Sequence, residues 1–207
     1  MAWLAALPDL LTAAGMLLVW LRPDLVGADW VARGVTTMLL EFFVVHASGF
    51  FAVVMYSDVS RLKRSLALGG LAAIYLAMLA AFAWGLHAWW MVSAFFWLTF
   101  GKIQAVWTGP RRREGSREQN AAIVAWAAGT ACYLAAVSAT ALLQWPVLGV
   151  TPQVAAAAGF QGTGLWEQQP HTALAAGVLY FGAMALVRVL VRRWLLAGRS
   201  TAPAAAG

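Results

Sequence analysis

Residues 34–56 read GVTTMLLEFFVVHASGFFAVVMY, and this stretch decides the fold. The run is apolar almost throughout, and it exceeds the roughly 20 residues that an α-helix needs to cross the hydrocarbon core of a bilayer. Two ionisable residues, Glu41 and His46, interrupt it. The stretch therefore predicts a membrane-spanning helix that carries polar groups into the lipid.

The rest of the chain has the composition of a membrane protein. Its 207 residues are 62% hydrophobic and 11% charged, whereas soluble domains contain roughly 45–50% apolar and about 25% charged residues. This composition excludes an ordinary soluble domain and a disordered chain. A disulfide-stapled module is excluded as well, because Cys132 is the only cysteine.

Further apolar runs predict an all-α integral membrane protein, a bundle of six transmembrane helices in one domain, residues 1–199. The expected spans are 4–21, 34–56, 66–86, 88–108, 120–144 and 171–191. Pro8 and Asp9 interrupt the first run, so we expect that span to be short or tilted, or a helix lying in the membrane interface. Asp9 is expected to cap this helix. The tail, residues 200–207, is predicted to be disordered.

Basic residues fall mainly on one side of this bundle. Only Arg22 and Arg33 fall on the other side, and the positive-inside rule places the majority in the cytoplasm. Both termini of a six-span chain are then cytoplasmic, and we expect a multi-pass protein of the plasma (inner) membrane. The run Arg111, Arg112 and Arg113 is expected to contact anionic lipid headgroups, and no nucleic acid is expected as a partner.

Glu41 and His46 are the strongest candidates for a functional site. An ionisable group near the middle of a span costs roughly 2.5–3.5 kcal/mol on insertion scales, so it usually faces the bundle interior and has a partner. The two side chains are five residues apart and point about 140° away from each other on an ideal helix. Hydroxyl groups on other spans lie at a similar depth. We therefore predict a polar cluster of Glu41, His46, Thr99, Tyr133 and Tyr180.

The longest connection, residues 145–170, lies on the outer side. A short helix is expected with Thr151 as its cap, Pro152 in its first turn and residues 153–158 after it, and Gly159 is expected to end it. Loops of this length tend to be functional or disordered. We expect Trp166 and Glu167 to form a lid or an entry to the polar cluster.

A second group of residues lies at one depth on the outer side, and it consists of His87, His171 and Glu167. Two histidines and a carboxylate can bind Zn²⁺ or another transition metal, and two histidines can hold a haem. The spacing is not that of a recognised metal motif. No cofactor is therefore predicted outright, and a metal ion or haem stays an alternative.

Three classes of function fit these features. The first is the binding or transport of a small solute or proton through the cluster around Glu41 and His46. The second is an accessory or scaffold subunit of a larger membrane complex, or a homo-oligomer, because stripes of small residues favour close helix contacts. The third is a membrane metal or haem redox protein. The sequence contains neither a phosphate-binding glycine loop nor a Gly-x-Ser-x-Gly elbow, so neither motif points to an enzymatic activity.

Overall fold

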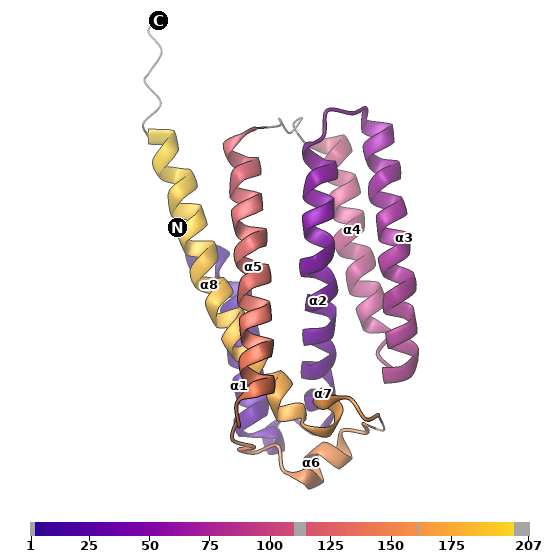
Figure 1. Ribbon diagram of the computed structural model, residues 1–207, viewed down its shortest axis with the longest axis vertical. Helices are drawn as coiled ribbons and strands as arrows, with labels where there is room; N and C mark the ends of the chain where they lie inside the picture. The colour runs from indigo at the N-terminus through magenta and orange to yellow at the C-terminus, as the bar shows by residue number, and fades with distance from the viewer. Residues whose placement is uncertain (1–2, 110–114, 161, 201–207) are drawn as a thin grey trace, which may run out of the picture.

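The computed structural model describes residues 3–109, 115–160 and 162–200. The long helices run side by side in alternating directions, as Figure 1 shows. They are α2 (Asp29–Tyr56), α3 (Arg61–Leu86), α4 (Trp90–Thr108), α5 (Arg117–Leu142) and α8 (Pro170–Ser200). The predicted lipid-binding run at residues 111–113 lies outside the described residues, as does the predicted tail beyond Ser200.

Helix α1 (Leu7–Leu21) is much shorter than these helices. Its 15 residues rise about 22 Å, which is less than the roughly 30 Å of a bilayer core. It stands between two 3-10 turns, η1 (Trp3–Ala5) and η2 (Pro23–Leu25). α1 packs along α8, and in Figure 1 it lies behind the lower part of that helix. The first turn of α1 is therefore placed beside the middle of α8.

Four helices are long and apolar enough to cross a membrane, namely α2, α3, α5 and α8. α4 is not among them, because Lys102 and Gln104 lower the mean hydropathy of its second half. α1 is apolar but short. The described chain is thus all-helical with four helices suited to a membrane, and six crossings stay a prediction.

Antiparallel packing gives the bundle two chemically different ends. We call the end where α2 and α8 finish, at the top of Figure 1, the basic end. It carries Arg61, Lys63, Arg64, Arg117, Arg192 and Arg193. The opposite end carries the two short helices α6 (Pro152–Ala157) and α7 (Leu165–Gln168), and we call it the loop end.

Helix α6 is the short helix that the sequence predicts, with Pro152 in its first turn as expected, and it ends at Ala157. Its N-cap, Thr151, accepts a hydrogen bond from the Val154 N–H at 3.4 Å, which satisfies one free amide of the first turn. Gly159 follows the helix with a φ of +82°, a left-handed conformation that glycine adopts without strain. Helix α7 lies in a stretch for which the sequence predicts only a polar loop.

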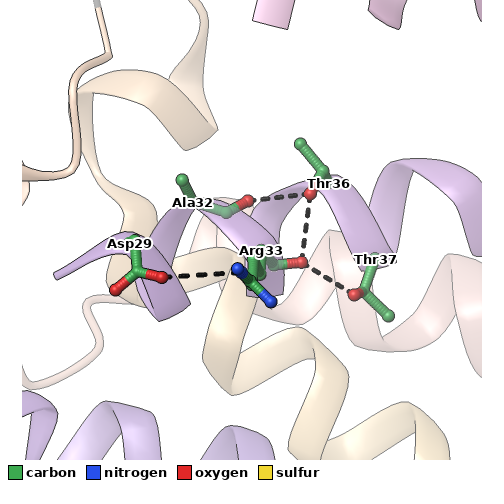
Figure 2. A network of polar contacts seen from close by, with 5 residues as sticks. All are labelled: Asp29, Ala32, Arg33, Thr36 and Thr37. Atoms are coloured by element: carbon green, nitrogen blue, oxygen red, sulfur yellow. Dashed lines mark hydrogen bonds and ion pairs between the residues drawn. The ribbon is translucent and has the colours of Figure 1, made fainter. Parts of the chain in front are cut away.

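Local hydrogen bonds satisfy the polar residues at the loop end of α2 (Figure 2). Thr36 Oγ1 donates to the Ala32 carbonyl at 2.9 Å, and Thr37 Oγ1 donates to the Arg33 carbonyl at 2.7 Å. Arg33 Nε lies 3.6 Å from Asp29 Oδ2. Asp29 in the first turn also opposes the positive end of the helix dipole. These residues therefore need no partner from another helix.

Helix α2 is the centre of the bundle and contacts α1, α3, α4, α5 and α8. Gly177 of α8 lies close to side chains of both α1 and α2. A β-carbon at this position would overlap Met16 Sδ of α1 and lie 3.2 Å from Met38 Sδ of α2. Met38 is fully buried. Methionine side chains of α1 and α2 therefore fill the space beside Gly177.

Replacing this glycine should loosen the bundle. We expect Gly177→Val to lower the free energy of unfolding by about 1–3 kcal/mol, because overpacking forces Met16 and Met38 out of place. Gly182→Val is the matched control on the same helix, since a β-carbon there meets no atom within 4 Å. Thermal unfolding in mild detergent measures both variants. Equal midpoints for the two would contradict the close packing.

Candidate functional site

A cavity of about 460 Å³ lies between α2, α4, α5 and α8. α4 and α5 each pack against α2, but among the described residues they do not pack closely against each other, which leaves this space. Its lining follows α2 from Glu41 to Tyr56, about 22 Å along the helix axis. The cavity therefore extends from the middle of the bundle toward the basic end.

Charged side chains from three helices line this cavity. They are Glu41 of α2, Lys102 of α4 and Arg188 of α8. Ser48 lies two turns beyond Glu41 on the same face of α2 and also lines the cavity, with its hydroxyl donating to the Val45 carbonyl at 2.8 Å. Charges act over longer distances in a membrane interior than in water, because the dielectric constant is low. The cavity is therefore a place where charged groups interact strongly.

Glu41 has a direct partner on α8. The Tyr180 hydroxyl donates to Glu41 Oε1 at 2.6 Å, within the range of a charge-assisted O–H···O⁻ bond. The Tyr180 ring is almost completely buried and packs edge-on against Tyr133, with 5.5 Å between the ring centroids. The Tyr133 hydroxyl donates to the Met38 carbonyl at 2.9 Å instead of to Glu41. The carboxyl of Glu41 is thus fixed at the inner end of the cavity.

An apolar cluster separates Glu41 from the loop end. Met38, Tyr133 and Tyr180 belong to one buried group, and Trp166 of α7 packs against it. These side chains close the space between α2, α5 and α8 on the loop-end side of Glu41. The site is therefore open toward the basic end and closed by aromatic rings in the other direction.

A second carboxylate, that of Asp9, lies beside this site. Arg188 Nε donates to Asp9 Oδ2, and Asp9 is only 5% exposed. Arg188 also lines the cavity that ends at Glu41. Asp9 was expected to cap α1, but the N-cap of that helix is Ala6, which has no side-chain hydrogen bond. The reason for this difference is that Asp9 binds the cation of α8.

His46 lies away from this cavity, on a different face of α2. Its Nδ1 is 2.9 Å from the Tyr75 hydroxyl of α3, and the imidazole is exposed on the surface of the bundle. Thr99 is buried on α4, and its hydroxyl has no hydrogen-bond partner among the described residues. The structure therefore brings Glu41, Tyr133 and Tyr180 together and places His46 in a separate group with Tyr75.

The two predicted entry residues, Trp166 and Glu167, lie on α7 at the loop end. They line a surface groove together with residues of α2 and α3, Val35 and Phe82 among them. The Glu167 carboxylate accepts hydrogen bonds from the Gly162 N–H at 3.2 Å and the Gly164 N–H at 3.3 Å. Glu167 therefore organises its own loop, and a role in entry stays a prediction.

The predicted metal-binding residues belong to separate elements. His87 ends α3 in a left-handed conformation with a φ of +50°. His171 is buried in the first turn of α8. Among the described residues, α3 and α8 do not pack closely, and no group of three or more His, Cys, Asp or Glu is placed to hold a metal ion. Metal or haem binding stays a prediction.

Comparisons of this chain with protein-family models, with curated proteins and with solved structures give no match.

The sequence did not predict that Asp9 and Arg188 lie beside the cavity that ends at Glu41. Asp9 follows Pro8 near the start of a helix, where a capping role is the usual interpretation. Arg188 lies close to Arg192 and Arg193, so it was grouped with the residues that flank the membrane. A usable signal was the depth of Asp9, because an aspartate inside an apolar span needs a partner of opposite charge.

The Asp9–Arg188 ion pair should stabilise the fold. Removing one partner of a buried pair costs about 3–5 kcal/mol, and we expect about 1–2 kcal/mol for Asp9→Asn because the Arg188 side chain is 51% exposed. A double-mutant cycle with Arg188→Gln measures the coupling, and the double variant should lose less stability than the sum of the singles. Strict additivity would contradict the pair. Asp24→Asn, in the exposed Arg22–Asp24 pair, is the control and should change little.

Proposed function

We propose that this chain is a multi-pass membrane protein that binds a small solute or a proton in the cavity ending at Glu41 and passes it across the bilayer. The observation that carries the proposal is the hydrogen bond between Tyr180 and Glu41 at the inner end of that cavity. A carboxyl group at this depth is costly to insert, and such groups are typical of ion and substrate pathways.

The surroundings of Glu41 suit a group that gains and loses a proton. Tyr180 donates a hydrogen bond to the carboxyl group, and the positively charged Arg188 lines the same cavity. Glu41 is therefore the residue on which we place the proton or the contact with the solute.

Access to Glu41 differs between the two sides of the bundle. The positive-inside rule assigns the basic end to the cytoplasm, so the cavity would open to that side. Passage to the loop end requires movement of the aromatic side chains of Tyr133 and Tyr180, because these rings close the path. We propose that displacement of Tyr180 from Glu41 is the step that opens the second side.

Neutralising Glu41 should abolish passage without unfolding the protein. We expect Glu41→Gln in proteoliposomes to reduce proton flux at least tenfold, because the amide cannot release a proton at this position. Flux is followed with a pH-sensitive dye trapped inside the vesicles, at a fixed membrane potential. If the wild-type protein carries no proton current, the same vesicles are loaded with radiolabelled small cations and organic anions.

The matched control is Glu118→Gln, which removes a carboxylate from the exposed first turn of α5. This variant should carry the wild-type flux, and both variants should elute as single species of wild-type size. Wild-type flux in Glu41→Gln, or equal losses in both variants, would refute the proposal.

A second function, that of an accessory subunit, is favoured by a separate observation. Phe96, Trp97 and Phe100 form an exposed aromatic row on α4, with 5.7 Å between the centroids of Phe96 and Trp97. The α3–α4 pair contacts the rest of the bundle mainly through α2, so its outer face is available to another membrane protein.

This alternative predicts a stoichiometric complex. Native mass spectrometry of protein extracted in mild detergent should then show a defined second subunit, and replacing both Trp97 and Phe100 by Ala should release it. Glu41→Gln should leave the complex intact. A monomer with lipid alone, at every detergent concentration, would rule out the accessory function.

A further inference from the structure

A second hollow, which we call the His46 groove, lies on the outer surface between α2 and α5. It has a volume of about 320 Å³ and is lined by residues that include His46, Gly49, Phe50, Gln119, Ile123 and Trp126. Phe50 and Ile123 are both exposed. α2 and α5 are each long and apolar enough to cross a membrane. In a bilayer that both helices cross, this groove faces the lipid, and molecules dissolved in the lipid can enter it.

His46 is the polar group at the inner end of this groove. Its Nδ1 is already paired with the Tyr75 hydroxyl at 2.9 Å, while Nε2 has no hydrogen-bond partner among the described residues. When Tyr75 donates to Nδ1, the imidazole carries its proton on Nε2 and presents an N–H donor. A polar N–H without a partner is costly in an apolar medium. The groove therefore favours a ligand that brings a hydrogen-bond acceptor to His46.

Aromatic side chains give the groove flat and fixed walls. The Trp126 indole lies directly against Gly49, where a β-carbon would be 2.6 Å from the ring carbon Cε2. Its Nε1 donates to the Val45 carbonyl at 3.1 Å, which fixes the plane of the ring. Phe50 meets His46 edge-on, with 5.4 Å between the ring centroids. Such walls suit a planar ring more than a flexible chain.

The depth of His46 distinguishes between the lipid-soluble molecules that could enter. Ten residues separate His46 from the end of α2 at Tyr56, so the imidazole lies about 15 Å along the axis from that end. The ester carbonyls of a phospholipid stay near the headgroups, and its acyl chains carry no acceptor at this depth. A neutral ring with carbonyl oxygens and an apolar tail provides both the acceptor and the solubility.

We propose that the His46 groove binds a lipid-soluble quinone, with one carbonyl oxygen accepting a hydrogen bond from His46 Nε2. Tyr75 acts as a positioning residue, because its hydroxyl sets the tautomer and the orientation of the imidazole. The ring lies between Phe50 and Trp126, and the tail extends from the groove into the lipid. This binding is independent of the passage of a solute or proton at Glu41.

The test uses the full chain in lipid nanodiscs with a photoreactive azido-benzoquinone that carries a decyl tail. We expect saturable labelling of the peptides that contain residues 46–53 and 119–126. His46→Leu should weaken binding about tenfold, and Tyr75→Phe should weaken it by a smaller factor. Phe96→Leu, which changes an exposed ring on α4, is the matched control and should bind as the wild type does.

Competition distinguishes recognition of the carbonyl from simple filling of an apolar groove. Unlabelled decyl-benzoquinone should displace the label at least tenfold more effectively than decylbenzene, which has the same tail and no carbonyl. Equal competition by the two compounds would overturn the proposal. Labelling that does not saturate, or labelling that is unchanged in His46→Leu, would overturn it as well. A Glu41→Gln variant should bind the quinone normally, which separates this result from the proposed transport.

Discussion

The low dielectric constant of the membrane interior is the constraint on which this structure depends, because it requires every buried charge to have a partner. The chain meets it with the Asp9–Arg188 ion pair. Asp9 lies in the first turn of a helix too short to cross the bilayer, so it is left beside the middle of α8. Arg188 reaches it because helical side chains lean toward the N-terminus of their helix and the arginine stem is long. The pair thus fixes α1 against α8 and holds a guanidinium beside the cavity that contains Glu41.

Two faces of the central helix α2 lie in different environments. Glu41 points into a cavity among α4, α5 and α8, while His46, about 140° around the helix, joins Tyr75 of α3 and a groove on the lipid side. Trp126 of α5 lines both spaces, and its indole donates to the Val45 carbonyl between the two residues. The Ser48 hydroxyl donates to the same carbonyl. Two side chains, Trp126 and Ser48, therefore add hydrogen bonds to the Val45 carbonyl, which lies between Glu41 and His46 in the middle of α2.

The sequence predicts the positions of the long helices well, because apolar runs of sufficient length leave little choice in a bilayer. The run 34–56 extends in the structure to Asp29, since local bonds satisfy Thr36 and Thr37. A count of residues from the ends of the predicted spans also places Tyr180 between the depths of Glu41 and His46. It cannot tell which helices are neighbours, however. The pairing of Asp9 with Arg188 joins the two ends of the chain, and that of His46 with Tyr75 depends on how α2 is rotated. Hydropathy contains neither kind of information.

The Tyr180–Glu41 hydrogen bond and the Asp9–Arg188 ion pair lie near each other but join different helices. The Tyr180–Glu41 hydrogen bond joins a neutral donor to a carboxyl, and hydrogen bonds to charged groups contribute about 1.5–3 kcal/mol. This hydrogen bond lies beside a buried cluster, because the Tyr180 ring is only 2% exposed and packs against Tyr133. Separating Asp9 from Arg188 leaves an aspartate that is only 5% exposed without its counter-charge, and this opposes any movement of α1 from α8. The ion pair therefore holds α1 against α8, and the hydrogen bond beside it, between α8 and α2, is the contact that the proposed pathway would have to open.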